Sequence, residues 1–237
     1  MKQSPILIDA NEIEQQNDSD IIFKFTGFDR EETSYYRTLH FRPTELSITG
    51  FYDGPWLQYD KKTFALYKIR FIFKYGLKGG LHQLINFDRM DKPVGEDVNK
   101  KQYFFVSSML TLVNPTKSRQ HKAGPPTKAI QIPTSLRYFI PYSFTGAISY
   151  IGSLFEGNCV EGVTYLIFDT PIVIKPGLHL TRFYSKNINL TRPIQDDRPT
   201  RYYISSNIEF LESRSELCPR IKIPISDKVS KDANIGI

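Results

Sequence analysis

The residues that could do chemistry are scattered rather than grouped in this sequence. Neither an H-x-H nor an H-x-x-x-H pair is formed by the four histidines, His40, His82, His121 and His179. The two cysteines, Cys159 and Cys218, lack the C-x-x-C spacing of a structural zinc site. Because metal sites usually draw on such local groups, the sequence predicts neither a metal nor another cofactor.

The sequence also lacks the familiar motifs of nucleophilic and nucleotide-dependent enzymes. There is no G-x-S-x-G nucleophile elbow, no phosphate-binding G-x-x-x-x-G-K and no dinucleotide-binding G-x-G-x-x-G. Asp196 and Asp197 stand between Pro193 and Pro199, a context typical of a solvent-facing loop. We therefore predict that the protein is not an enzyme. A hydrolase with dispersed carboxylates stays open as an alternative.

Charge is distributed unevenly along the chain. Residues 1–34 hold three bases and eight acids, a net charge of −5, whereas the whole chain carries +6. No Asp or Glu occurs between Val98 and Phe155, a stretch that contains seven bases: Lys100, Lys101, Lys117, Arg119, Lys122, Lys128 and Arg137. Such a stretch is either a solvated basic face or a surface that meets phosphate.

Alternating apolar and polar residues predict β-strands along most of the chain, and an aromatic content of 14% favours sheet. The clearest strand covers residues 64–75, where Tyr67, Ile69, Phe71, Phe73 and Tyr75 are apolar and Lys68, Arg70 and Lys74 form one wet face. Other strands or extended pieces are expected over 21–26, 39–42, 102–113, 129–132, 135–140, 163–169, 171–175 and 201–211. A short helix is expected over 81–88.

These elements predict an all-β protein: a single eight-stranded antiparallel jelly roll, or two-sheet sandwich, with long connecting loops. We expect an acidic N-terminal segment over 1–20, a jelly-roll shell domain over 21–212 and a C-terminal tail over 213–237. No apolar run reaches the ~18 residues needed to cross a bilayer, so no membrane span is expected. The first 20 residues also lack the features of a secretory signal.

Several short segments resemble motifs of one viral family. Phe64–Arg70 is similar to a strand of the form F-x-x-Y-[KR]-[IV]-R, and Ser135–Pro141 is similar to an S-R-Y-F-x-P segment. Asn114–His121 is similar to an N-Y-S-S-R-H loop, and Tyr202–Phe210 to an aromatic closing strand. In this order and spacing the chain resembles the capsid proteins of circoviruses and related small circular single-stranded DNA viruses. The similarity covers roughly residues 20–212. The acidic N-terminus departs from the arginine-rich arm of that family.

The resemblance implies a coat protein that self-assembles into a small icosahedral shell around a single-stranded DNA genome. Its implied partners are other copies of the chain and the genome, and it leaves room for a host surface receptor. The implied location is the virion. The host nucleus is a second location that the family suggests, although the basic N-terminal signal is absent.

For nucleic-acid binding we predict sequence-independent phosphate contacts from two rows of bases. They are Lys68, Arg70 and Lys74 in one row, and Lys117, Arg119, Lys122 and Arg137 in the other. Aromatic candidates for interfaces are Trp56, Tyr59, Tyr75, Tyr103 and Tyr142. Two alternatives stay open: a β-sandwich module that binds glycans or proteins, and a jelly-roll minor capsid or movement protein of another virus.

Overall fold

The structure is a computed structural model that describes most of the predicted strands. The described residues are 8, 11–16, 20–30, 36–42, 45–51, 54–73, 81–89, 102–112, 127–131, 135–154, 161–174 and 199–212. Within these ranges the chain forms 14 strands and two short 3-10 turns, with no α-helix. In the same ranges, no helix is long and apolar enough to cross a membrane.

The described strands extend from Ile13 to Leu211. Their bounds are β1 Ile13–Gln16, β2 Phe23–Thr26, β3 Tyr36–Arg42, β4 Glu45–Thr49, β5 Trp56–Tyr59, β6 Lys62–Phe73, β7 Leu81–Arg89, β8 Tyr103–Leu112, β9 Thr127–Gln131, β10 Gly146–Ser153, β11 Glu161–Phe168, β12 Ile172–Ile174, β13 Thr200–Ile204 and β14 Ile208–Leu211. The turns are η2 Leu136–Phe139 and η4 Ser205–Asn207.

The main sheet has the order β1-β13-β10-β11-β8-β7-β6-β4-β3-β9. Most neighbours are antiparallel, but β1 with β13, β11 and β12 with β8, and β14 with β2 are parallel pairs. The prediction of an all-β protein is confirmed. The prediction of an eight-stranded antiparallel jelly roll is wrong, because this sheet is mixed and has more strands.

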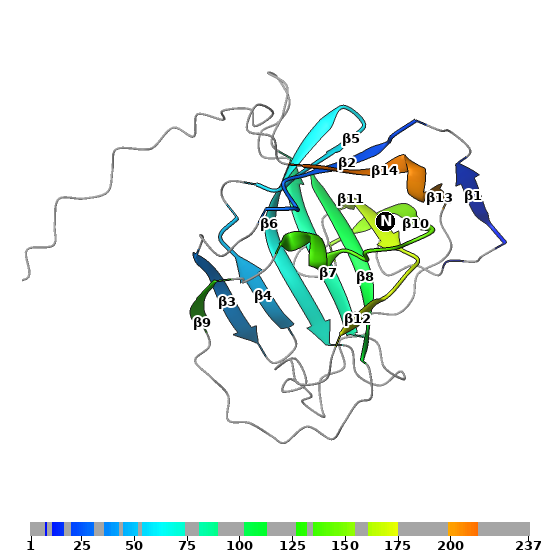
Figure 1. The fold of residues 1–237 in the computed structure, drawn as a ribbon. Coiled ribbons are helices and arrows are strands. Elements are labelled where there is room, and N and C mark those ends of the chain that lie inside the picture. Colours follow the sequence, from blue (N-terminus) through cyan, green and yellow to red (C-terminus); the bar gives the residue numbers. More distant parts are fainter. Residues whose placement is uncertain are drawn as a thin grey trace, which may run out of the picture.

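A smaller layer crosses one face of the main sheet (Figure 1). It consists of β2, β5 and β14, and it joins the main sheet through the pairing of β5 with β6. The main hydrophobic core lies between the two layers and contains Phe23 and Phe25 of β2, Leu57 of β5 and Ile208 of β14. Apolar residues on β4, β6, β8 and β11 complete it from the other side.

Aromatic rings fill the centre of this core. The ring of Phe23 stacks on Tyr59 at a centroid distance of 4.9 Å and meets Tyr203 edge-on at 4.9 Å. Phe104 on β8 is the fourth ring of the group, and its centroid lies 6.0 Å from that of Phe23. Burial raises the pKa of Tyr59 to about 12, and the neighbouring Tyr203 adds to the shift. Many of the aromatic side chains that the structure describes are therefore used in the interior.

Three expected elements differ from the prediction. Residues 81–89 form β7, not a helix, because this segment pairs on both sides, with β6 and with β8. Residues 136–139 form a 3-10 turn in which the Ser135 hydroxyl accepts a hydrogen bond from the Arg137 backbone. The strand expected over 201–211 is divided at Asn207, whose buried side chain bonds Ile204 N and Asp20 O.

Replacement of Phe23 by Ala should destabilise the fold by about 3–5 kcal/mol, because the side chain is fully buried and contacts three other rings. Urea unfolding measures the change. Tyr36→Ala is the control, since Tyr36 is 73% exposed and its loss should change stability by less than about 0.5 kcal/mol. Equal effects of the two substitutions would contradict this assignment of the core.

Candidate functional site

The main sheet has a second face, turned away from the small layer. Successive residues of a strand point to opposite faces, and β8 shows this alternation. Phe104 and Val106 belong to the main core, whereas Phe105 belongs to a second cluster with Tyr150, Val163 and Tyr165. Side chains on this second face do not contribute to the main core, and several of them are buried in a cluster of their own.

A β-bulge changes which residues of β6 reach the second face. The pairing of β6 with β7 shifts between Leu66 and Lys68, so that Tyr67 is an extra residue. Leu66 and Ile69 are both buried in the main core. Tyr67 and Lys68 therefore stand consecutively on the second face. Simple alternation placed Tyr67 with Ile69, and that part of the prediction is wrong.

Aromatic rings form a row across the second face, starting at the bulge. The ring of Tyr67 lies 6.1 Å from that of Tyr103, which lies 6.2 Å from Phe105. The row continues through Tyr165, at 5.4 Å from Phe105, to Tyr150, which stacks on Tyr165 at 4.8 Å. Phe105, Tyr165 and Tyr150 are buried, while Tyr67 and Tyr103 are half-buried. The accessible end of the row is thus the end beside the bulge.

A network of charged side chains lies on the second face, on the other side of the bulge from the aromatic row. The Nζ atom of Lys68 lies 2.9 Å from Oε1 of Glu45, and Nη2 of Arg70 donates a hydrogen bond to Oε2 of the same carboxylate. The Glu45 and Arg70 side chains are only 3% and 5% exposed, whereas Lys68 is 19% exposed. Lys68 is therefore the member of the network that a ligand can reach most readily.

The surroundings of Glu45 lower the pKa of its carboxylate. Burial alone would raise its pKa, but hydrogen bonds and charges from Arg70 and then Lys68 outweigh burial and lower the pKa below 4.5. Polar residues extend the network along β4 and β3. Ser47 is buried, and the hydroxyl of Thr49 is 2.9 Å from Nε2 of His40.

The structure places two bases of the first predicted row in this network rather than on a wet surface. Lys68 and Arg70 do share one face of β6, as predicted, but both engage Glu45, and Arg70 is buried. Lys74 lies outside the described residues, as do Lys117, Arg119 and Lys122 of the second row. For these bases, nucleic-acid binding stays a prediction.

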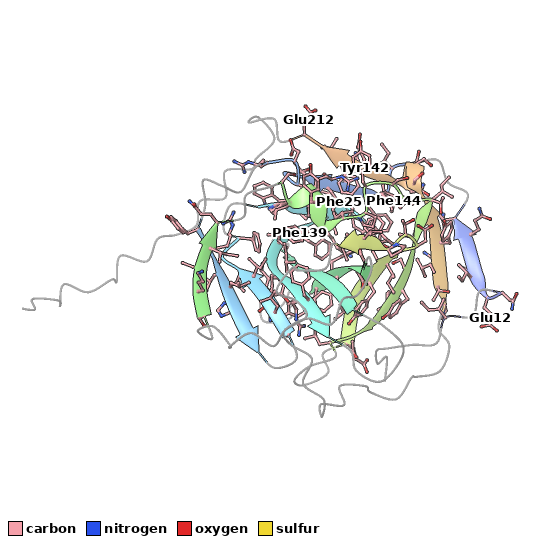
Figure 2. The ribbon with its side chains drawn as sticks, turned by 60° about the horizontal axis from the view of Figure 1, so that its bottom comes forward. Glu12, Phe25, Phe139, Tyr142, Phe144 and Glu212 are labelled. Carbon is pink, nitrogen blue, oxygen red and sulfur yellow. The ribbon has the colours of Figure 1, made fainter. Side chains whose placement is uncertain are left out.

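Arg137, the remaining predicted base, holds a turn together. Its guanidinium donates to the carbonyls of Ile140, Pro141 and Tyr142, at 3.2, 3.0 and 3.4 Å. It also lies over the ring of Phe210, 4.0 Å from the centroid. Burial lowers its pKa, and the charge of Tyr142 works in the opposite direction. Tyr142 itself is 92% exposed, on the turn labelled in Figure 2.

Sequence reasoning missed the residues that organise the second face. Glu45, Ser47 and Thr49 alternate with Leu46 and Ile48, and this pattern was a usable signal of a polar strand face. No comparable local signal marked Tyr67, because the bulge arises only from pairing with β7.

Comparisons with known proteins bear on the fold. No family model matches the sequence, and no curated protein does either. Among solved structures, dioscorin complexed with ascorbate is similar with a TM-score of 0.64 and 16% identity, over 86% of each chain. The α-carbonic anhydrase of Photobacterium profundum has a TM-score of 0.55 and 18% identity, covering 82% of this chain and 85% of that one.

A third similar structure is the α-carbonic anhydrase of Thermovibrio ammonificans with the inhibitor sulfanilamide. It has a TM-score of 0.59 and 14% identity, and covers 85% of this chain and 86% of that one. At these identities the likeness shows the fold alone. The predicted viral capsid function is wrong, because the fold of this chain is the one shared by dioscorin and α-carbonic anhydrases. That fold includes enzymes, so the fold alone does not support the prediction that this protein is not an enzyme.

A carbonic anhydrase fold raises the question of zinc, which three histidines hold in such enzymes. The described residues include no group of three or more His, Cys, Asp or Glu that could hold a metal. Of the four histidines, His121 and His179 lie outside the described residues, and only the backbone of His82 is described. The described residues therefore do not fit a three-histidine zinc site.

Replacement of Glu45 by Gln should destabilise the protein by about 3–5 kcal/mol, because it leaves Lys68 and Arg70 without their shared counter-charge. The pKa of Glu45 is lowered by folding, so its stabilisation is complete above pH 4.5 and is lost as the pH falls through the folded value. Urea unfolding as a function of pH should thus show a flatter acid limb for the variant.

The matched control is Glu14→Gln. Oε2 of Glu14 is 3.6 Å from Nε of Arg201, and both side chains are more than half exposed. This pair should contribute about 0–1 kcal/mol. Equal losses at the two positions would show that the Glu45 network is not the buried element described above.

Replacement of Arg137 by Ala should cost about 1–3 kcal/mol, because three carbonyls lose their donor and Phe210 loses its cover. Arg137→Lys should restore little, since an ammonium group lacks the planar fork. Thermal unfolding measures both. Tyr138→Ala, at a residue 73% exposed on the same turn, is the control and should have almost no effect.

Proposed function

We propose that this protein binds small organic anions on the second face of the sheet, beside the bulge in β6, and does so without a zinc-dependent reaction. The observation that carries the proposal is the consecutive placement of Tyr67 and Lys68 on one face. It sets an aromatic surface directly beside an ammonium group that is partly exposed. Such a combination suits a ligand with a flat or apolar body and a negative group.

The roles of the residues follow from their chemistry. The rings of Tyr67 and Tyr103, tilted by 48° to one another, would contact the body of the ligand. Lys68 would attract the anionic group while Glu45 holds its ammonium in place. Thr49 and His40, joined to each other at 2.9 Å, offer polar atoms to ligand hydroxyls farther along the face.

Two further observations support a binding protein over a carbonic anhydrase. The described residues do not fit the three-histidine zinc site of that enzyme class. Dioscorin, which shares this fold, was solved in complex with ascorbate, a small organic anion. We therefore propose binding without catalysis, and we assign no reaction step to the face.

Isothermal titration calorimetry with ascorbate and, separately, glucuronate tests this proposal. The wild-type chain should bind at least one of them. Lys68→Gln should weaken that binding about tenfold or more, because a hydrogen bond to a charged group contributes about 1.5–3 kcal/mol. Tyr67→Leu should also weaken binding while leaving the ion network with Glu45 in place. Treatment of the wild-type chain with a chelator should leave binding unchanged.

The matched control is Lys62→Gln on the same strand. Lys62 is partly exposed and pairs with Asp60 at 3.1 Å, away from the aromatic row. Its replacement should leave binding as it is. Absence of heat with both anions, or equal weakening by the Lys62 and Lys68 variants, would overturn the proposal. Unfolding curves recorded for each variant separate lost binding from lost structure.

A further inference from the structure

The two edges of the main sheet differ in charge. Strand β1 is one end of the sheet order and β9 is the other, and Figure 1 shows them on opposite sides of the molecule. Within the described residues, β1 pairs only with β13 and β9 only with β3. An edge strand presents backbone N–H and C=O groups that another strand can pair with.

The structure relates these edges to the uneven charge of the sequence. Strand β1 comes from residues 1–34, with their net charge of −5, and β9 comes from the stretch between Val98 and Phe155 that lacks acids. Glu12, immediately before β1, and Glu14, within it, are exposed. Figure 2 shows Glu12 at the margin of the molecule beyond β1, opposite the green strand β9.

Strand β9 presents a suitable complement. Thr127, Lys128, Ala129 and Gln131 are exposed, so that only Ile130 is partly covered. Lys128 supplies a positive charge, and no proline interrupts the strand. The two edge strands are also similar in length, with four residues in β1 and five in β9. Backbone pairing over such a length is compatible with contact between Lys128 and the acids beside β1.

We propose that two copies of this chain associate head to tail, with the β1 edge of one copy against the β9 edge of the next. The partner is a second copy because one chain carries both complementary edges. Acidic residues on one edge and a base on the other favour this pairing over β1 with β1, where like charges would meet. The contact is heterologous, since it joins different surfaces, and it produces a chain or a ring of copies.

The contribution of individual charges can be ranked. Glu14 lies 3.6 Å from Arg201 of the same copy, which offsets part of its charge. Glu12 carries no such contact among the described ion pairs, so both acids are replaced together in the test below. Because all these groups are exposed, salt should weaken the association.

Sedimentation velocity of the full chain at low and at high salt, over a wide range of protein concentration, tests the proposal. The wild type should self-associate at low salt and dissociate at high salt. Lys128→Glu should weaken self-association on the order of tenfold, and the double variant Glu12→Lys with Glu14→Lys should do the same. A mixture of the two variants should associate again, since each then meets an opposite charge.

Lys62→Glu is the control for net charge, since Lys62 is a partly exposed base on β6, away from both edges. It should leave self-association as in the wild type. A wild type that stays monomeric at low salt overturns the proposal. So does a Lys128→Glu variant that associates normally, or a mixture of the two edge variants that fails to associate.

Discussion

One carboxylate organises the polar half of the sheet's second face. Glu45 pairs with Lys68 and Arg70 at once, and it is almost completely buried while doing so. Ionised groups can be kept out of water only where opposite charges and hydrogen bonds satisfy them. Strands β4 and β6 can therefore carry charged side chains toward the interior only as this set. The face that results is polar and ordered at one end and aromatic at the other.

The arrangement of β6 explains how the two ends of this face meet. Leu66 is buried in the main core, so a regular strand would have kept Tyr67 on the second face and sent Lys68 into the core. The extra residue at the bulge turns Lys68 to the same side as Tyr67. Bulges are frequent next to functional sites because they redirect single side chains without disturbing the rest of a sheet. Here the redirected side chain joins an aromatic surface to a charge.

Period-two patterns predicted much of the β-structure. Phe23 and Phe25 are buried as their alternation indicates, and the last strand ends at Leu211, where the sequence placed its end. An alternating pattern does not show which strands pair with one another. The parallel pairs, the central position of β7 and the bulge therefore could not be predicted from the sequence. The Phe64–Arg70 motif and the Ser135–Pro141 motif are real structural features, a strand and a clamped turn. Such features occur in many folds, so their presence does not identify one fold.

The small layer ties the two ends of the described chain together. Strand β14 pairs in parallel with β2, and Phe210 stacks on Phe25. A ribosome makes β14 long after β2, so Phe23 and Phe25 must wait for all the intervening strands before this part of their cover arrives. Completion of the core is thus delayed until β14 has been made. Chains that terminate before β14 would leave these aromatic residues without the ring of Phe210 beside them.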